Sequence, residues 1–227
     1  MPLSHLDRET SADKICLSVL KNLPPFKIKT ALTEEDYQGA FRLVYQEYRK
    51  RGFCPPADSQ MRFSELCFLP GSRLFILEER GQMTGALSLL ADEKGGLPME
   101  TSFASEVSAV RKKGRKLAEL SLFAVAREAF DEHDQGLGVY QKFRHAFLLF
   151  KSMFDYARQA GVADLLIAIH PRQRKLYQAL SFKVIGEECQ YKEAEGNPAL
   201  PMHLDVIDFV RNPEISPMRY FFLNYSL

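Results

Sequence analysis

Two polar side chains, Glu119 and Ser121, interrupt an otherwise apolar run between Lys116 and Val125. Such a run is typical of a central strand that is covered on both faces of a sheet. Because residues two apart project to the same face of a strand, the carboxylate and the hydroxyl are expected side by side. A buried carboxylate is costly unless it is paired, hydrated or used. The pattern therefore predicts either a Glu119 paired with a nearby arginine or a Glu119 that lines a functional cleft.

A second candidate for chemistry is His170, which follows another apolar run, Ala163 to Ile169. Ligands of α/β sheets bind at the carboxyl ends of strands, where neighbouring strands diverge, so a histidine at such an end is a candidate substrate contact. A histidine before Pro171 is also a common structural hydrogen-bonding residue. Both interpretations stay open.

The chain is nearly neutral, with a formal net charge of +1, but its basic residues are unevenly distributed. The densest cluster contains Arg111, Lys112, Lys113, Arg115 and Lys116. Such a cluster is either a solvated helix end beside the negative end of the helix dipole or a surface that steers an acidic partner. A smaller set, Arg172, Arg174 and Lys175, is a second candidate surface.

Composition restricts the class of protein. The 227 residues suit one large domain or two small ones, and a hydrophobic content of 46% supports a sizeable core. The small net charge argues against nucleic-acid binding through overall charge. Four scattered cysteines (Cys16, Cys54, Cys67, Cys189) lack metal-ligand spacing and are expected to be reduced thiols. No apolar run approaches the ~18 residues of a membrane span, so a cytoplasmic location without a transmembrane segment is expected.

Periodicity and cap signals predict the elements that position these residues. A capping box at Thr33 begins a helix that Gly52 ends. The other expected elements are a helix over 11–23, a strand from Ile28 to Ala31, a hairpin of Leu74–Glu78 with Thr84–Ala91, a helix capped by Thr101 or Ser102 and running to Lys113, the strand at Lys116–Val125, an amphipathic helix from Tyr140 to Ala160, the strand Ala163–Ile169, a helix ending at Leu180, and strands Phe182–Tyr191 and Met202–Phe209. This order predicts an α/β fold with a mixed sheet and a parallel strand pair at its centre.

The order of elements, with the segment from Leu176 to Phe182, resembles the GNAT (acyl-CoA N-acyltransferase) fold, in which a central parallel strand pair splays and helices flank the sheet. Ser181 stands where that family usually has glycine. Within the superfamily the chain looks like the long-chain N-acyl amino acid synthases of the FeeM type, which are related to the acyl-homoserine-lactone autoinducer synthases. The resembling segments are FRLVYQEYRKRGF (41–53), GALSLLAD (85–92), GLPME (96–100), GRKLAELSLFAV (114–125), HPRQRKLYQALSFKVIGE (170–187) and NPALPMHLDV (197–206).

The resemblance implies a site. Glu119 would act as base, and Tyr177 occupies the position where many GNAT enzymes place a tyrosine near the leaving sulfur; the alternative for Tyr177 is a helix residue packed on the sheet. Backbone N–H groups near Phe123, Ala124 and Val125 would face the thioester. Ser121, His170 and Arg115 complete the predicted substrate-binding set, and Arg111, Lys112, Lys113 and Lys116 the predicted partner-binding set. The phenylalanine stripe Phe143, Phe147, Phe150 and Phe154 is expected in the core, with an acyl tunnel alongside it.

Two departures from the related families refine the implied substrates. The coenzyme A pyrophosphate loop of GNAT acetyltransferases has only a shifted, imperfect counterpart at His133–Gly138, which favours acyl carrier protein as donor. The autoinducer synthases carry E-x-S-R-F-x-V on the central strand, and Leu122 replaces that arginine here, which favours an amino-acid acceptor over S-adenosylmethionine.

We therefore predict an N-acyltransferase with no permanently bound cofactor or metal. Its co-substrate would be acyl-acyl carrier protein, carrying a 4'-phosphopantetheine thioester, or acyl-CoA. The predicted division is an N-terminal extension (1–30), an acyltransferase domain (31–210) and an aromatic tail packed on it (211–227). The alternatives are a CoA-dependent acetyltransferase of a small amine and a non-catalytic acyl-binding module.

Overall fold

The computed structural model describes residues 26–93, 96–126, 144–212 and 219–224. Three predicted features lie outside these ranges: the helix over 11–23, the His133–Gly138 segment and the first turn of the helix expected from Tyr140, with Phe143. Within the described part of the chain, no helix is long and apolar enough to cross a membrane.

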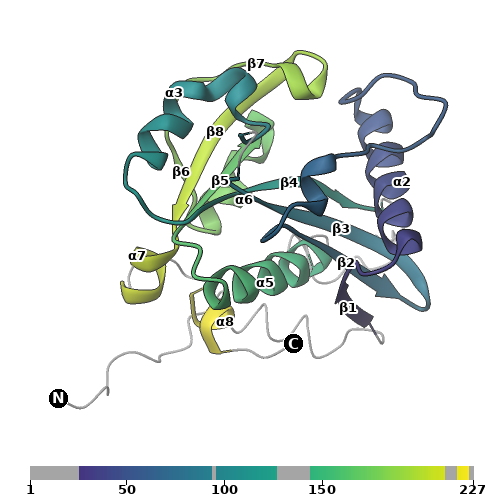
Figure 1. The fold of residues 1–227 in the computed structure, drawn as a ribbon, viewed down its shortest axis with the longest axis horizontal. Helices are drawn as coiled ribbons and strands as arrows, with labels where there is room; N and C mark the ends of the chain where they lie inside the picture. The colour runs from purple at the N-terminus through teal and green to yellow at the C-terminus, as the bar shows by residue number, and fades with distance from the viewer. Residues whose placement is uncertain (1–25, 94–95, 127–143, 213–218, 225–227) are drawn as a thin grey trace.

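A mixed sheet forms the centre of the molecule (Figure 1). Its strands are β1 (Phe26–Thr30), β2 (Arg73–Glu79), β3 (Gln82–Ala91), β4 (Leu117–Val125), β5 (Asp164–Ile169), β6 (Lys183–Val184), β7 (Cys189–Tyr191) and β8 (Asn197–Asp205). The order across the sheet is β1-β2-β3-β4-β5-β8-β6, and β7 pairs with β8. The pairing is antiparallel except between β4 and β5, which confirms the predicted central parallel pair.

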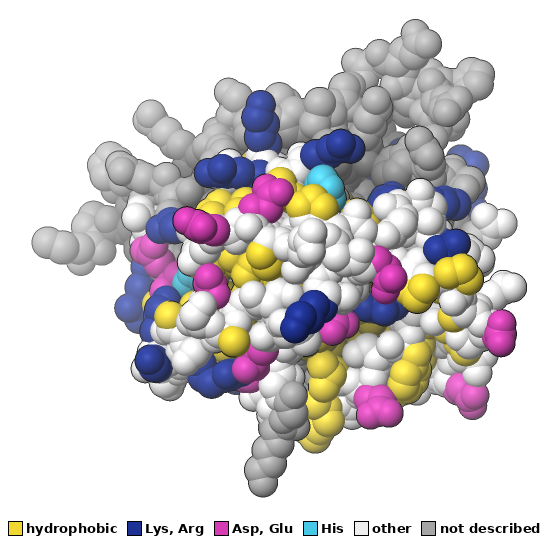
Figure 2. Space-filling model, turned by 90° about the horizontal axis from the view of Figure 1, so that it is seen from above, with side chains coloured by type: hydrophobic (Ala, Val, Ile, Leu, Met, Phe, Trp, Pro, Cys, Tyr) yellow, Lys and Arg dark blue, Asp and Glu magenta, His cyan; other side chains and the backbone are white. Residues whose placement is uncertain are grey.

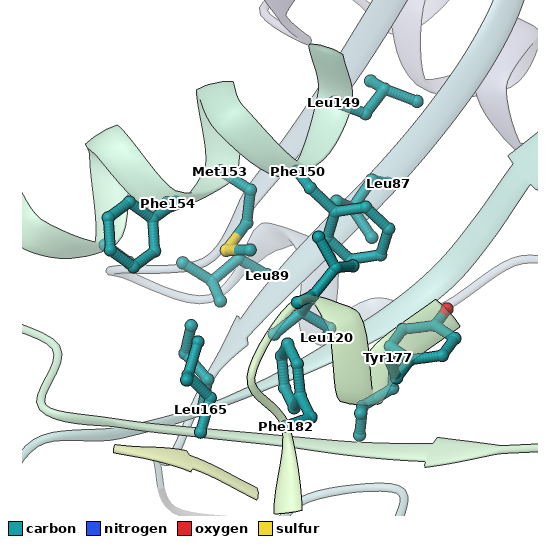
Figure 3. Close-up of a cluster of buried hydrophobic side chains, with 14 of the residues drawn as sticks. Leu87, Leu89, Leu120, Leu149, Phe150, Met153, Phe154, Leu165, Tyr177 and Phe182 are labelled. Carbon is teal, nitrogen blue, oxygen red and sulfur yellow. The ribbon is translucent and has the colours of Figure 1, made fainter. Parts of the chain in front are cut away.

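Helices cover both faces of this sheet. The helices are α2 (Glu34–Arg51), α3 (Glu100–Arg111), α5 (Arg144–Gln159), α6 (Arg174–Ala179), α7 (Val206–Arg211) and α8 (Arg219–Asn224), with short 3-10 turns η1 (Glu65–Phe68), η3 (Pro171–Gln173) and η4 (Lys192–Ala194). α2 and α3 contribute to one apolar cluster, and α5 to α8 contribute to another. The second cluster contains Phe147, Phe150 and Phe154, so three of the predicted phenylalanines lie in the core (Figure 3).

The α2 helix begins and ends as its sequence predicts. The Thr33 hydroxyl accepts a hydrogen bond from the Asp36 N–H, and the Asp36 carboxylate accepts one from the Thr33 N–H. Gly52 ends the helix with φ +71°, a conformation that costs glycine little. Ser181, which follows α6, also has a positive φ, +69°. The backbone there adopts the conformation for which the related family uses glycine.

The parallel strands β4 and β5 separate soon after they begin. Their register pairs Leu117 with Asp164, Ala118 with Leu165 and Glu119 with Leu166, and the pairing stops there. Beyond that point β4 stays with β3 and β5 stays with β8. The two strands therefore diverge at Glu119.

A bulge in β4 accompanies the divergence. Ala86 pairs with Ala124 and Ser88 with Ser121, so two residues of β4 lie opposite one of β3, and Leu122 has φ +48°. The bulge reverses the alternation of the strand. Leu120 contributes to the apolar cluster on the α5 face, whereas Leu122 contributes to the cluster on the α2 face. Simple alternation from the sequence does not predict this reversal.

The bounds of three predicted elements are wrong: the start of the helix before Lys113, the strand Phe182–Tyr191 and the strand Met202–Phe209. α3 begins at Glu100 without a side-chain cap from Thr101 or Ser102; instead the Glu100 carboxylate accepts a hydrogen bond from the Leu97 N–H. The expected strand Phe182–Tyr191 is two short strands, β6 and β7, separated by Gly186.

The last predicted strand, Met202–Phe209, is displaced. β8 begins earlier, at Asn197, and ends at Asp205, whose side chain caps α7 by accepting a hydrogen bond from the Asp208 N–H. β8 contains Pro198 and Pro201, which normally argue against an interior strand.

At the two ends of the described chain, β1 extends the sheet and α8 packs against α5 and α7. β1 pairs with β2 along its whole length and lies within the segment predicted as an extension. In α8, Phe221 and Phe222 are buried, and the ring of Phe222 packs edge-on against Phe154 and Phe209. The predicted division into segments remains a prediction.

Candidate active site

A cavity of about 410 Å³ lies where β4 and β5 diverge. Its walls include residues 119–125 of β4 and Ile167, Ala168 and Ile169 of β5. α6 contributes Leu176 and Tyr177, and the loop after α2 contributes Phe53 and Arg62. The divergence of two strands thus opens the sheet into a cleft that has both apolar walls and many polar and charged side chains.

Glu119 lies at the point where the cleft begins. Its side chain is 1% exposed, and its Oε2 accepts a hydrogen bond from the Met99 N–H at 2.9 Å. Burial, with smaller contributions from the negative charges of Glu193 and Glu100, raises the pKa of Glu119 to about 8. Within the described residues no lysine or arginine forms an ion pair with Glu119, so the alternative of a paired glutamate finds no support there.

Six more predicted site residues line the same cavity: Ser121, Phe123, Ala124, Val125, His170 and Tyr177. Ser121 is half-buried, and its carbonyl accepts a hydrogen bond from the Ser88 hydroxyl. His170 stacks on Phe53 with ring centroids 6.1 Å apart, and its Nδ1 accepts a hydrogen bond from the Arg172 N–H at 3.2 Å. That bond fixes the orientation of the imidazole at the cavity wall.

The bulge leaves the Phe123 backbone without a partner in β3. The Phe123 backbone lies close enough to the hydroxyl of Tyr48, another cavity residue, to lower its pKa, but burial is the larger influence and raises that pKa to about 12. A backbone N–H that is outside the ladder and borders a cavity is suited to binding a carbonyl oxygen on which negative charge develops.

Tyr177 is both a packing residue and a cavity residue. Its ring packs edge-on against Phe150 and Phe182, and the side chain is 2% exposed (Figure 3). It also borders the cavity, and burial raises the pKa of its hydroxyl well above the ordinary value. Tyr177 is therefore a neutral hydroxyl, able to donate a hydrogen bond, at ordinary pH.

Sequence reasoning missed several polar residues of the cavity. Tyr48, Arg51, Arg62, Tyr191 and Glu193 all line it. Tyr48 and Arg51 come from α2, inside the resembling segment 41–53, whereas the other three come from the loop after it, β7 and η4, which carry no recognisable motif. Tyr48 recurs with Tyr37 and Tyr45 at helical spacing, a pattern that indicates either core residues or a pocket mouth, and that spacing was the available signal.

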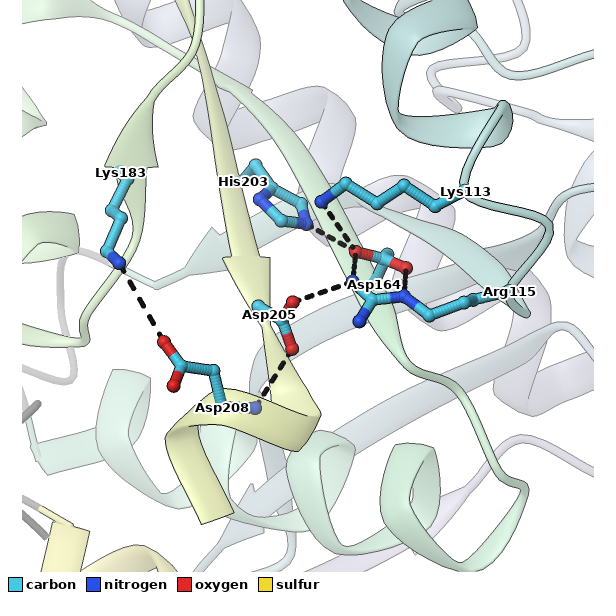
Figure 4. Close-up of polar contacts among 7 residues, drawn as sticks. All are labelled: Lys113, Arg115, Asp164, Lys183, His203, Asp205 and Asp208. Atoms are coloured by element: carbon cyan, nitrogen blue, oxygen red, sulfur yellow. Dashed lines mark hydrogen bonds and ion pairs between the residues drawn. The ribbon is translucent and has the colours of Figure 1, made fainter. Parts of the chain in front are cut away.

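The predicted binding residue Arg115 lies outside the cavity lining. Its guanidinium is bound by Asp164, with Nε to Oδ2 at 2.7 Å, and by Asp205 at 2.6 Å (Figure 4). Asp164 also accepts hydrogen bonds from His203 at 2.7 Å and Lys113 at 3.4 Å. These contacts join the start of β4 to β5 and β8, at the end of the strand opposite the cleft.

In the predicted partner-binding cluster, Arg111 and Lys113 bind carboxylates, whereas Lys112 and Lys116 are exposed. Arg111 binds Asp92 at 2.7 Å and Glu100 at 2.5 Å, and Lys116 donates to the carbonyl of Ala160. On the face seen in Figure 2, Lys and Arg side chains are interspersed with Asp and Glu and form no continuous basic field. Arg172, Arg174 and Lys175 are exposed beside the cavity residues Gln173 and Leu176.

Comparison with known proteins gives a consistent result. The family model described as N-acyl amino acid synthase FeeM matches residues 39–205. No curated protein sequence matches the chain. Among solved structures, FeeM, an N-acyl amino acid synthase from uncultured soil microbes, is similar with a TM-score of 0.73 and 24% identity, over 87% of this chain and 97% of that one.

Two further structures share the fold at lower similarity. The acyl-homoserine-lactone synthase LasI has a TM-score of 0.59 and 14% identity, over 81% of this chain and 91% of its own. An acyl-CoA N-acyltransferase from Pseudomonas aeruginosa has a TM-score of 0.51 and 15% identity, over 79% and 97%. The GNAT fold predicted from the sequence is thereby confirmed. With a family match across most of its length, the chain belongs to the FeeM family of N-acyl amino acid synthases and is an acyltransferase.

Proposed function

We propose that the protein transfers a long-chain acyl group from a thioester, carried by acyl carrier protein, to the α-amine of an amino acid. The observation that carries the proposal is the buried Glu119, without a cationic partner among the described residues, at the head of the cleft between diverging strands. A raised pKa makes this carboxylate a stronger base than an exposed one, as removal of a proton from an ammonium group requires.

In the proposed reaction, Glu119 takes a proton from the amine, directly or through water. The amine nitrogen then attacks the thioester carbonyl carbon and forms the amide bond, while the C–S bond breaks. The Phe123 N–H, which lies near the Tyr48 hydroxyl, would stabilise the oxyanion. The nitrogen releases its second proton to water, and the leaving thiolate takes one up from water. The Tyr177 hydroxyl, which is neutral at ordinary pH, would donate a hydrogen bond to the sulfur.

The lining of the cleft supports a fatty acyl group. Leu120, Leu122, Ile167, Ile169 and Leu176 contribute apolar walls. Each methylene transferred from water to such a wall is worth ~0.8 kcal/mol, so a long chain would be bound far more tightly than an acetyl group. An acetyl donor would leave most of this apolar surface unused.

An acyl carrier protein is acidic, and the exposed residues Arg172, Arg174 and Lys175 offer it a basic surface beside the cleft. The predicted cluster at 111–116 is less suited, because Arg111, Lys113 and Arg115 already bind carboxylates. We therefore propose docking on the surface formed by Arg172, Arg174 and Lys175, where charge complementarity would increase the association rate.

The test is a donor and acceptor matrix analysed by mass spectrometry. Palmitoyl-acyl carrier protein, palmitoyl-CoA and acetyl-CoA are each incubated with the protein and a panel of amino acids. We expect N-palmitoyl amino acids, with the carrier-protein donor preferred. Product from acetyl-CoA alone would establish the CoA-dependent acetyltransferase instead. No product from any donor, with palmitoyl ligands bound, would establish an acyl-binding module.

Charge reversal separates the two basic surfaces. R172E/R174E/K175E is expected to raise the KM for palmitoyl-acyl carrier protein at least tenfold and to leave the KM for palmitoyl-CoA within about twofold. K112E/K116E is the matched control at the other end of β4. A larger effect of the control than of the triple variant would reverse the assignment.

A further inference from the structure

Among the residues that the structure describes, two arginines line the cavity, and they differ in how they are held. Arg51 Nη1 donates to the Glu47 carbonyl and to Glu47 Oε2, both at 2.7 Å, and the Glu47 side chain is 1% exposed. Lys50 Nζ also binds this carboxylate, at 2.8 Å from Oε1, so Glu47 holds two cations at the end of α2. Removing Arg51 would weaken the compensation of a buried charge. Arg51 is therefore committed to its own helix.

Arg62 is held more loosely. Its Nη2 donates to the carbonyl of Glu193 at 2.8 Å, but the Glu193 carboxylate lies at 3.3 Å and is 38% exposed. An ion pair of this length, between two side chains that are both partly exposed (Arg62 28%), contributes little and exchanges readily with solvent or another anion. The pair joins the loop after α2 to η4, residues 131 apart in the chain. Another carboxylate can therefore replace Glu193 on the guanidinium of Arg62.

Arg62 and the proposed base line the same cavity. The hydroxyl of Tyr191 experiences the negative charges of Glu119 and Glu193 and the positive charge of Arg62. The charge of Glu193 also acts on Glu119. One tyrosine thus lies within electrostatic range of the buried carboxylate and of the guanidinium. An α-amino acid carries an amine and a carboxylate on one carbon, and needs a base and a cation close together.

We propose that Arg62 binds the α-carboxylate of the acceptor, which displaces the Glu193 side chain and directs the α-amine towards Glu119. This inference rests on the proposed amino-acid acceptor. A guanidinium binds a carboxylate through two parallel hydrogen bonds, which fixes orientation as well as position. In the unliganded cleft, Glu193 occupies the position that the substrate carboxylate takes.

The arrangement predicts how acceptors are selected. An amine without a carboxylate, or an amino-acid amide, would leave Glu193 on Arg62 and gain no ionic contact. An acceptor therefore binds Arg62 only if its carboxylate forms better hydrogen bonds with the guanidinium than Glu193 does. Selectivity for acids over amides would reside in Arg62 and not in the apolar walls of the cleft.

The experiment compares an acceptor amino acid with its amide, using wild type and R62Q. For the amino acid, R62Q is expected to raise KM tenfold or more with a smaller change in kcat; for the amide, KM should change less than about twofold. The preference for the acid over the amide should therefore disappear. R62K, which keeps the charge but not the paired geometry, should lie between wild type and R62Q.

Glu193 gives an independent measurement. E193Q removes the competing carboxylate, so the KM for the amino acid should fall. R49Q is the matched control. Arg49, like Arg62, donates to a backbone carbonyl: its acceptor is Cys54, in the loop that carries Arg62, at 2.8 Å. Arg49 lies outside the cavity lining. R49Q should leave both KM values unchanged.

The outcomes distinguish this inference from the proposed function. If wild type acylates no amino acid, the proposed function fails. Suppose instead that wild type acylates amino acids. If R62Q then keeps the preference for acids, or if E193Q raises the KM for the amino acid, the role assigned to Arg62 is overturned and the proposed function stands. Equal effects of R49Q and R62Q would attribute the change to the loop. Should R62Q not fold, R62K and E193Q still decide the matter.

Discussion

Replacing Glu119 with glutamine should change the pH dependence of stability, independently of any substrate. Glutamine keeps the size of the side chain and an oxygen that can accept the Met99 N–H. It lacks the titrating charge. The pKa of Glu119 is raised from 4.5 to about 8 in the folded protein, chiefly by burial. The neutral form is therefore the one that the fold accommodates.

The sign and size follow from linkage. Because the folded pKa exceeds the unfolded one, the favourable contribution is complete below pH 4.5 and is lost as pH rises towards 8. Each pH unit in this window costs the wild type about 1.4 kcal/mol, so the full loss is about 5 kcal/mol. For a chain of this size, 1 kcal/mol corresponds to roughly 2–4 °C in Tm. E119Q should thus gain about 10–20 °C over wild type by pH 8.

Thermal unfolding followed by circular dichroism at half-unit steps from pH 4.5 to 8.5 measures this difference. The other ionisable groups titrate in both proteins, so subtraction of the two curves isolates Glu119. We expect nearly equal Tm values at pH 4.5 and a difference that widens steadily to pH 8. Parallel curves, or a wild type that is more stable than E119Q at pH 8, would refute the inference that Glu119 is buried without a compensating cation.

The same variant gives a kinetic readout. With a pKa of about 8, roughly a tenth of Glu119 is ionised at pH 7. The kcat/KM of wild type should therefore rise about tenfold per pH unit below 8. E119Q should lose about 10²–10⁴ in kcat/KM and keep only the limb that belongs to the amine of the acceptor. An E119Q profile with the wild-type shape and height would remove Glu119 from the mechanism.

Three further predictions concern other parts of the fold. Y177F keeps the ring that packs against Phe150, so we expect an unchanged Tm and a kcat lowered about 10²-fold in steady-state assays. D164N leaves Arg115 and His203 without their shared buried carboxylate, so urea unfolding at pH 7 should show a loss of about 3–5 kcal/mol. Because the pKa of Asp164 is lowered, this loss should shrink as pH falls through the carboxylate range. G85A places a Cβ 2.8 Å from Leu149, and calorimetry should show a destabilisation of about 1–3 kcal/mol.

Those parts of the fold that depend on local chemistry could be predicted from the sequence. The capping box at Thr33 and the left-handed Gly52 delimit α2, and both are properties of a few adjacent residues. The β4 bulge could not be predicted, because Leu122 adopts a positive φ that nothing in its own side chain favours. The bounds of β8 could not be predicted either, because they depend on contacts with a strand distant in the sequence. The pairing of β8 with β5 outweighs the two prolines that argue against a strand.

Some residues of the candidate site could likewise be predicted from the local sequence, and others could not. Glu119 was recognisable because a carboxylate in an apolar strand conflicts with its surroundings, and such conflicts mark functional positions. The basic residues carried no such signal: whether an arginine is available depends on which carboxylates lie nearby. Arg115 pairs with the buried Asp164, 49 residues away, and its charge is thereby committed to the framework. Arg62 pairs with the partly exposed Glu193, 131 residues away. The difference between a structural arginine and one suited to a substrate therefore lies in the burial of its partner, which only the folded chain determines.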